Sequence, residues 1–239
     1  MGLTGKNNEE KAWNFLKGKI KNDFGVSGLM GELFAESGLN PQNLQNSYEK
    51  KLGFTDATYT AAVDSGSYAN FVHDSAGYGV AQWTFWSRKE ALLNYVRALG
   101  ASIGDLEAQL GFLYKELSES YPSVLAALKT ATSVRAASDK VLTDFERPAD
   151  QSEAVKIKRA SYGQTYYDKY AKAAASTPSE GGNNMSNSPL VNCTVKSPNQ
   201  SGKRTHSIDT LTPHCVVGQL TAEGIGSCFP AGREASCNY

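Results

Sequence analysis

Apolar residues recur every three to four positions along most of the chain up to Tyr170, which is the spacing of one face of an α-helix. The segments with this pattern are residues 12–20, 26–34, 92–99, 106–117, 123–128, 138–145 and 154–170. The pattern predicts a mostly α-helical domain. For the second segment, Ser27 is the expected N-cap, and Gly38 and Pro41 are expected to end the helix.

Residues 48–80 break the helical pattern, because Gly, Asp, Tyr and Thr are scattered through them without a regular apolar face. We expect one long irregular segment here, after the second helix. A loop of this length inside a compact domain more often carries function than not.

Composition changes again after the helical region, where Ser, Gly, Asn and Pro dominate and large apolar residues are almost missing. We therefore expect three regions: a helical domain at residues 1–173, a flexible linker at 174–190 and a separate piece at 191–239. Short β-branched runs at 208–211 and 215–217 suggest strands in this last piece, so it is expected to be a small α/β fragment.

Charge gives few hints of a partner. Lys plus Arg and Asp plus Glu both number 24, so the formal net charge is zero and nucleic acid is not an expected partner. No apolar run approaches the ~20 residues of a membrane span, and the N-terminus lacks the features of a secretory signal peptide. The four cysteines all lie beyond residue 192, without CxxC spacing, and are expected to be buried thiols.

Glu36 is the residue with the clearest chemical potential. It falls in the last turn of the second predicted helix, where the negative end of the helix dipole disfavours an ionised carboxylate. Phe34 and Leu39 could remove water from it, so Glu36 is expected to keep a proton, as the general acid of glycoside cleavage must. On position alone, a solvated residue at a helix end is the better interpretation.

Three strings carry a family resemblance. AESGLNP at residues 35–41 resembles the Glu-Ser motif of the lysozyme and lytic transglycosylase superfamily. GYGVAQWTFWSRKEALLNYV at 77–96 and DFERPADQSEAVKIKRASYGQTYYDKY at 144–170 resemble the phage tail lysozyme family. The resemblance extends from about Asn8 to Ala173. It implies a lysozyme-like helical fold with Glu36 as the general acid; Glu32, one turn earlier, is the competing carboxylate.

The same resemblance implies a sugar-binding cleft formed by Ser37, Tyr78, Gln82 and Trp83. A Gln amide can hydrogen-bond an N-acetyl group or a hydroxyl, and aromatic faces suit the apolar face of a pyranose. Core packing is the alternative for Trp83, and a structural salt bridge is the alternative for Arg88.

The second catalytic carboxylate is harder to find. Asp64 and Asp74 both lie in the irregular segment, and Asp74, close to the Gly-Tyr-Gly turn, is the first choice. The separation of the two carboxyls would decide between retention and inversion, and spacing along the sequence does not provide it.

Residues 203–239 resemble the opening of a phage-type zinc N-acetylmuramoyl-L-alanine amidase, and His214 matches the first zinc ligand of that family. A catalytic zinc needs about three protein ligands, whereas His73, His206 and His214 are the only histidines of the chain. The amidase piece is therefore expected to be truncated and inactive, with zinc bound only in a complete parent protein. No cofactor is expected for the helical domain.

The resemblances imply a muramidase that cleaves the β-1,4 bond between N-acetylmuramic acid and N-acetylglucosamine, with bacterial peptidoglycan as partner. A lytic transglycosylase acting on the same bond is the first alternative, and a non-catalytic wall-binding or virion module is the second. Such a protein would be made in the bacterial cytoplasm and would act on the wall after release or as part of a phage particle.

Overall fold

The computed structural model describes residues 2–172, and within this range the chain is mostly helical. Extended pairing in these residues is limited to two isolated bridges, Leu44 with Tyr78 and Tyr78 with Trp83. The helices are α1 (Asn8–Ile20), α2 (Asp23–Ser37), α3 (Asn46–Leu52), α4 (Asp56–Asp64), α5 (Trp86–Ala98), α6 (Leu106–Glu119), α7 (Pro122–Lys129), α8 (Val134–Val141), the π-helix η1 (Leu142–Glu146), α9 (Glu153–Tyr166) and the π-helix η2 (Tyr167–Lys172).

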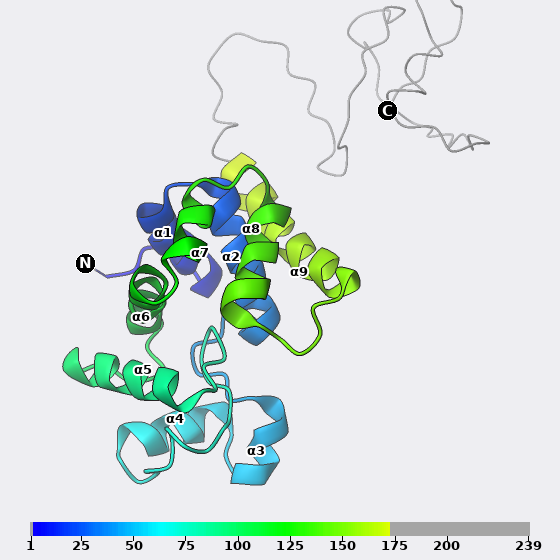
Figure 1. Ribbon diagram of the computed structural model, residues 1–239. Coiled ribbons are helices and arrows are strands. Elements are labelled where there is room, and N and C mark those ends of the chain that lie inside the picture. Colours follow the sequence, from blue (N-terminus) through cyan, green and yellow to red (C-terminus); the bar gives the residue numbers. More distant parts are fainter. Residues whose placement is uncertain (1, 173–239) are drawn as a thin grey trace, which may run out of the picture. The chain divides into compact units, whose positions relative to one another are not determined.

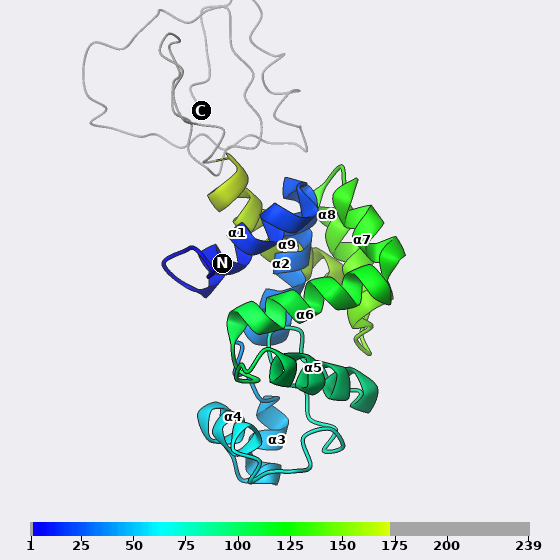
Figure 2. The same ribbon diagram turned by 90° about the vertical axis from the view of Figure 1, so that its left-hand side faces the viewer.

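Helix α2 lies at the centre of the upper group of helices in Figure 1, among α1, α7, α8 and α9, and α3, α4 and α5 form a second group below it. Figure 2 shows α6 between the two groups. Every residue of α2 from Gly25 to Leu33 is buried. At Gly31 an added Cβ would lie 2.5 Å from the backbone nitrogen of Gly163. Glycine therefore lets α2 and α9 approach closely.

The predicted helices at residues 12–20, 26–34, 92–99, 106–117 and 123–128 are all confirmed. One boundary is wrong. Asn22, not Ser27, caps α2 by accepting a hydrogen bond from the Gly25 backbone N–H at 2.9 Å, and Ser27 is buried inside the helix. The end of the helix is confirmed, because Gly38 adopts a left-handed conformation with φ 62°.

The irregular segment is shorter than predicted, because residues 48–80 include most of α3 and all of α4. A capping box between Thr55 and Thr58 begins α4. Only Tyr59, Thr60 and Val63 of α4 are buried, which is too few apolar positions for a visible helical period. The chain between α4 and α5 follows the prediction and contains turns and bends.

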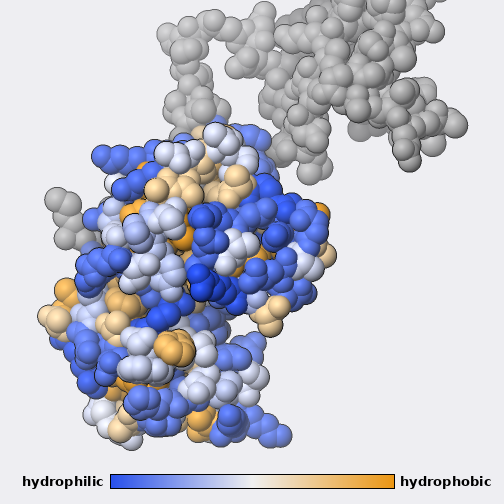
Figure 3. Space-filling view, viewed as in Figure 1, coloured by the Kyte–Doolittle hydropathy of each residue, from blue (hydrophilic) through white to orange (hydrophobic). Residues whose placement is uncertain are grey.

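The linker expected at residues 174–190, the fragment expected at 191–239 and the zinc ligand expected at His214 lie outside the described residues. Among the helices of residues 2–172, none is both long enough and apolar enough to cross a membrane. The face seen in Figure 3 is mostly hydrophilic, with small, separate apolar patches.

Candidate functional site

Glu36 lies in the last turn of α2. The C-terminal end of this helix points toward the lower group of helices (Figure 1). The space-filling view has a concave outline between the part that contains α8 and α9 and the part that contains α3 (Figure 3). The Glu36 side chain is 19% exposed. Its carboxyl is thus partly open to a ligand.

A tight hairpin, residues 78–83, lies against this end of α2. Tyr78 and Trp83 exchange backbone hydrogen bonds of 3.2 and 3.0 Å. The Ser37 hydroxyl donates to the carbonyl of Val80 at 2.9 Å, and also contacts the carbonyl of Leu33 at 3.1 Å. The helix that carries Glu36 is therefore tied directly to the hairpin.

Gln109 of α6 holds the hairpin and the exit of α2 together. Its Oε1 accepts from the Val80 backbone N–H at 2.9 Å, and its Nε2 donates to the carbonyls of Pro41 and Ile103 at 2.6 and 2.5 Å. The side chain is fully buried. Nothing near Gln109 in the sequence indicates this role, since its partners lie far away along the chain.

Arg159 of α9 bridges the two carboxylates of α2. Its Nη1 lies 2.9 Å from Glu32 Oε2 and 2.5 Å from Glu36 Oε1. Glu32 is fully buried and also accepts from the Ser138 hydroxyl at 2.6 Å. Burial raises the pKa of Glu32, although Ser138 and Arg159 act against this. Burial alone would lower the pKa of Arg159. The nearby carboxyls of Glu36 and Glu32 outweigh this effect, so the pKa of Arg159 is raised.

Glu146 ends η1, in the string that resembles the closing segment of the family. The residue is half-buried, but its Oε1 is shielded from solvent and has no hydrogen-bond partner in the described residues. Burial raises the pKa of Glu146 well above its ordinary value, and the charge of Glu36 is the next largest cause. The π-helical turn that carries Glu146 is a geometry often found at functional sites.

Arg88 closes the other side of this region. Its Nε and Nη2 donate to Glu116 Oε1 and Oε2 at 2.6 and 2.9 Å, so the pair is bidentate. Trp83 Nε1 donates to the same Glu116 carboxylate at 3.0 Å, and the Arg88 guanidinium lies 4.7 Å from the Phe145 ring centroid. Arg88 therefore makes a structural salt bridge with Glu116. The sequence analysis named this as the alternative to a functional role for Arg88.

The placement of Asp74 corrects its expected catalytic role. Its carboxylate is fully buried, 2.5 Å from Lys89 Nζ, and accepts from the Tyr59 hydroxyl at 2.5 Å and from the Ala76 backbone N–H at 2.9 Å. Burial lowers the pKa of Lys89, and Asp74 offsets part of this. A carboxylate with these partners and no exposed surface cannot position a water molecule on a substrate, so we assign Asp74 to the core.

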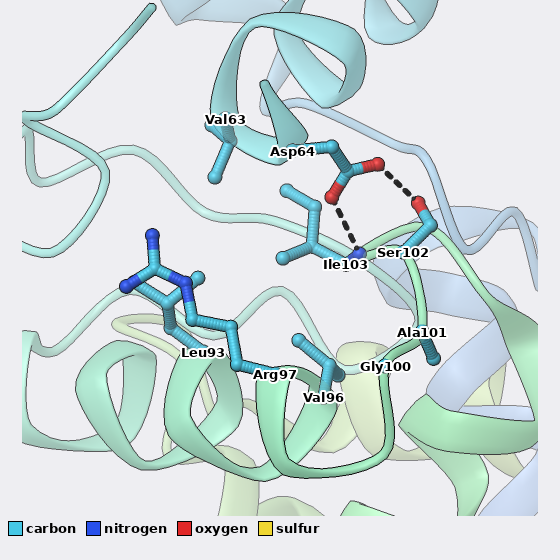
Figure 4. A pocket seen from close by; sticks show the side chains of 9 residues that line it. All are labelled: Val63, Asp64, Leu93, Val96, Arg97, Gly100, Ala101, Ser102 and Ile103. Atoms are coloured by element: carbon cyan, nitrogen blue, oxygen red, sulfur yellow. Dashed lines mark hydrogen bonds between the residues drawn. The ribbon is translucent and has the colours of Figure 1, made fainter. Parts of the chain in front are cut away.

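Asp64, the other candidate, also serves the fold. It accepts from the Ser102 hydroxyl at 2.5 Å and from the Ile103 backbone N–H at 2.9 Å, which joins α4 to the loop before α6 (Figure 4). This corner borders a cavity of about 250 Å³ that is also lined by Leu93, Val96 and Arg97. No residue of the Glu36 cluster lines this cavity, so we do not place the reaction there.

Tyr78 and Trp83 are corrected from sugar contacts to core residues. Neither side chain has exposed surface, and the Tyr78 hydroxyl lies 2.6 Å from Thr60 Oγ1. A ring with no exposed face cannot stack on a pyranose. Gln82 is half-buried, and its Nε2 donates to the backbone carbonyl and the side chain of Asn43 at 3.0 and 2.9 Å, so its amide hydrogens stabilise the hairpin.

The exposed aromatic residues of this segment come directly after the hairpin. Phe85 and Trp86 are 61% and 49% exposed, and their ring centroids lie 6.0 Å apart. With His73, whose ring centroid is 6.3 Å from that of Trp86, they line a groove of about 410 Å³ that also includes Ser75 and Thr84. This groove has the apolar faces and polar rim that Tyr78 and Trp83 were expected to supply.

The sequence analysis missed Glu146, Arg159 and Gln109. For Glu146 and Arg159 the only available signal was their place in the closing string, since neither has a motif of its own. Within residues 2–172 no three His, Cys, Asp or Glu side chains are grouped to hold a metal ion. The zinc expectation for His214 concerns residues outside this range.

Comparison with protein families covers most of the helical domain. The family model described as phage tail lysozyme matches residues 7–170, which include α2, the hairpin and α9. None of the curated proteins matches the chain at a significant level. The match assigns the chain to the lysozyme-type peptidoglycan hydrolases, which act on the bacterial cell wall or in a phage particle. The chain belongs to the phage tail lysozyme family.

Proposed function

We propose that this protein hydrolyses the β-1,4 bond between N-acetylmuramic acid and N-acetylglucosamine in peptidoglycan, with Glu36 as the general acid. One observation carries the proposal. Glu36 is a partly exposed carboxyl that pairs with Arg159, and the adjacent Ser37 is hydrogen-bonded to the hairpin whose sequence resembles the family's signature. Glu32, the competing carboxylate, is fully buried and accepts hydrogen bonds from Ser138 and Arg159.

In the reaction, Glu36 gives its proton to the glycosidic oxygen while the bond from that oxygen to the anomeric carbon breaks. The carbon passes through an oxocarbenium-like state, and water adds its hydroxyl there. The second proton of that water returns to the carboxyl cluster, which balances the step. A general acid of this kind contributes roughly 10²- to 10⁴-fold to the rate.

Sugar contacts are assigned to the groove lined by His73, Phe85 and Trp86. Exposed aromatic faces can pack against the apolar face of a pyranose, and Ser75 and Thr84 offer polar groups at its rim. The groove residues Thr84, Phe85 and Trp86 follow the hairpin directly along the chain. The Gln82 carbonyl oxygen and Ser37 remain candidates for contacts near the acid.

A lytic transglycosylase outcome is the second candidate. In that reaction a hydroxyl of the muramic acid itself attacks the anomeric carbon and forms an anhydro ring, so no carboxylate nucleophile is required. The engagement of both Asp64 and Asp74 in structural contacts favours such a route. Amidase activity is proposed only for a longer parent protein in which the zinc site containing His214 is complete.

Mass spectrometry of digested peptidoglycan tests the proposal. We expect the protein to release fragments with reducing N-acetylmuramic acid ends from purified Gram-positive cell wall. Anhydro ends would assign it to the transglycosylases instead. If the protein bound the wall and released neither product, it would be a wall-binding module and the enzymatic proposal would fail.

A further inference from the structure

Helices α2, α8 and α9 meet around the buried carboxyl of Glu32 (Figure 1). Its Oε1 accepts a hydrogen bond from the Ser138 hydroxyl of α8 at 2.6 Å, and its Oε2 lies 2.9 Å from Arg159 Nη1 of α9. Both oxygens of this fully buried carboxyl therefore have a partner. Because a buried charge that loses its partner costs much free energy, Glu32 holds the Arg159 guanidinium in place.

Two glycines of α2 let the other helices approach Glu32 closely. At Gly28 an added Cβ would lie 2.7 Å from the backbone nitrogen of Ser138, and at Gly31 it would lie 2.7 Å from the backbone carbonyl oxygen of Arg159. Each close approach therefore involves the backbone of a residue whose side chain binds Glu32. The packing of three helices, and not a surface loop, sets where the Arg159 side chain begins.

Arg159 contacts Glu36 with the same nitrogen that contacts Glu32. Its Nη1 lies 2.5 Å from Glu36 Oε1, and the two side chains are 14% and 19% exposed. Within residues 2–172 this is the one side-chain hydrogen bond of the Glu36 carboxyl, so Oε1 is held and Oε2 is left without a protein partner. Because a carboxyl is planar, holding Oε1 also limits where Oε2 can lie.

We propose that Arg159, anchored by Glu32, is a positioning residue for Glu36: it holds Oε1 of that carboxyl so that Oε2 delivers the proton to the glycosidic oxygen. The O–H bond on Oε2 breaks, its proton binds the glycosidic oxygen, and the electron pair stays on the carboxylate, whose Oε1 remains with Arg159. Glu32 acts only through Arg159. The part of Arg159 in catalysis rests on the proposed function, but its anchoring by Glu32 does not.

Nitrogen NMR of the Arg159 guanidinium tests the anchoring without any assay of activity. A held guanidinium rotates slowly and gives separate signals for its two Nη groups, whereas a free one gives an averaged signal. We expect separate signals in the wild type and in Glu36→Gln, because Glu32 still holds Nη1, and an averaged signal in Glu32→Met. Glu119→Met, at a surface residue that is 61% exposed, is the matched control and should keep them separate. An averaged signal in Glu36→Gln, or separate signals in a folded Glu32→Met, would overturn the anchoring.

Kinetics on soluble peptidoglycan fragments test the positioning itself. We expect Arg159→Gln to lower kcat about 10- to 10²-fold with KM close to that of the wild type, because the acid is misplaced while substrate still binds. Both carboxylate contacts come from one nitrogen, so the single ammonium of Arg159→Lys should recover part of the loss. Arg135→Gln, which removes a guanidinium paired with Asp139 and Glu153, is the control and should leave kcat unchanged.

The two measurements separate this inference from the proposed function. An unchanged kcat in a folded Arg159→Gln, or a loss that Arg159→Lys does not reduce, would overturn the positioning role. If the wild type cut no glycan while the Arg159 signals behaved as expected, the proposed function would fail and the anchoring would stand. The Arg159 signals in Glu36→Gln decide the anchoring even if Glu32→Met does not fold, and Arg159→Lys decides the positioning if Arg159→Gln does not: wild-type kcat and KM support it, and a loss of kcat in the folded Lys variant as large as that of Glu36→Gln overturns it.

Discussion

The buried pair of Lys89 and Asp74 has no exposed surface on either side chain, and its groups are joined at 2.5 Å. Replacing Asp74 by Asn would leave the Lys89 ammonium buried without an opposite charge. We expect Asp74→Asn to lower the free energy of unfolding by about 3–5 kcal/mol, measured by urea denaturation.

A double-mutant cycle with Lys89→Met gives the control for this prediction. Because the double variant removes both charges, it should be less destabilised than the sum of the two single variants. A stable Asp74→Asn variant with greatly reduced glycan cleavage would instead support the catalytic role that the structure argues against.

At the residue scale, the Glu-Ser string made Glu36 the candidate acid, and this role stays a prediction. The sequence misjudged the burial of Asp74, Tyr78 and Trp83. Burial could not be deduced in the same way, since Trp83 and Trp86 are three residues apart in one motif, yet one is fully buried and the other 49% exposed. The sequence did not show that Asp74 is buried in an ion pair, because its partner Lys89 lies further along the chain, on α5.

The hairpin at residues 78–83 is the element that orders the site, and Gly79 is its most constrained residue. Its φ is +75°, and an added Cβ would lie 2.6 Å from Gln109 Oε1. We expect Gly79→Ala to strain the backbone, displace Gln109 and reduce both the melting temperature and the rate of glycan release. Gly18→Ala in α1, where an added Cβ meets nothing within 4 Å, is the control and should lower neither the melting temperature nor the rate. Wild-type behaviour of Gly79→Ala would show that the hairpin does not depend on Gln109.

The start of α5 carries the proposed sugar-binding groove. Because Trp86 would contact substrate away from the reacting atoms, we expect Trp86→Ala to raise KM several-fold with little change in kcat. Its side chain is half exposed, so the melting temperature should stay close to that of the wild type. A fall in kcat at constant KM would place Trp86 at the chemical step and contradict this assignment.

Elements with strong apolar periodicity were predicted well, and polar ones were not. Helix α6 buries eight residues and was visible in the sequence, while α4 buries three and was not. The π-helical turn η1 looks like a continuation of α8 in sequence, because a change from α to π hydrogen bonding leaves the apolar pattern almost intact. Its consequence for Glu146 therefore required the structure.

For the whole molecule, the carboxyls with raised pKa predict how stability depends on pH. The pKa values of Glu32 and Glu146 lie above the ordinary 4.5 in the folded protein. Below 4.5 both are protonated in the folded and unfolded states, and as pH rises the unfolded chain ionises first. We expect the free energy of unfolding to fall from pH 4.5 toward neutral pH, and to fall less in Glu146→Gln. Denaturation across this range measures it.

Glu119→Gln serves as the control for this series and should follow the wild type at every pH. Parallel curves for the wild type and Glu146→Gln would mean that Glu146 ionises as readily in the folded protein as in the unfolded chain. The lowered pKa values of Asp144, caused mainly by Lys140, and of Asp150, caused mainly by its bond from Ser152, act below 3.8 and do not overlap this window.

The boundary of the helical domain expected near residue 173 stays a prediction; the family match ends at residue 170. The convergence of Glu32, Glu36, Glu146 and Arg159 was not predictable, since it depends on how closely α2 packs against α8 and α9. Spacing along one chain does not give distances between helices that are more than 100 residues apart.

The most direct test of the central claim compares Glu36→Gln with Glu119→Gln in the release of reducing ends from purified peptidoglycan. Both variants exchange one carboxylate for an amide, but Glu119 is an exposed residue that pairs with Lys115. We expect Glu119→Gln to match the wild type and Glu36→Gln to lose roughly 10²- to 10⁴-fold in rate while it keeps its fold and still binds the wall. A folded Glu36→Gln that released reducing ends at the wild-type rate would contradict the assignment of Glu36 as the general acid.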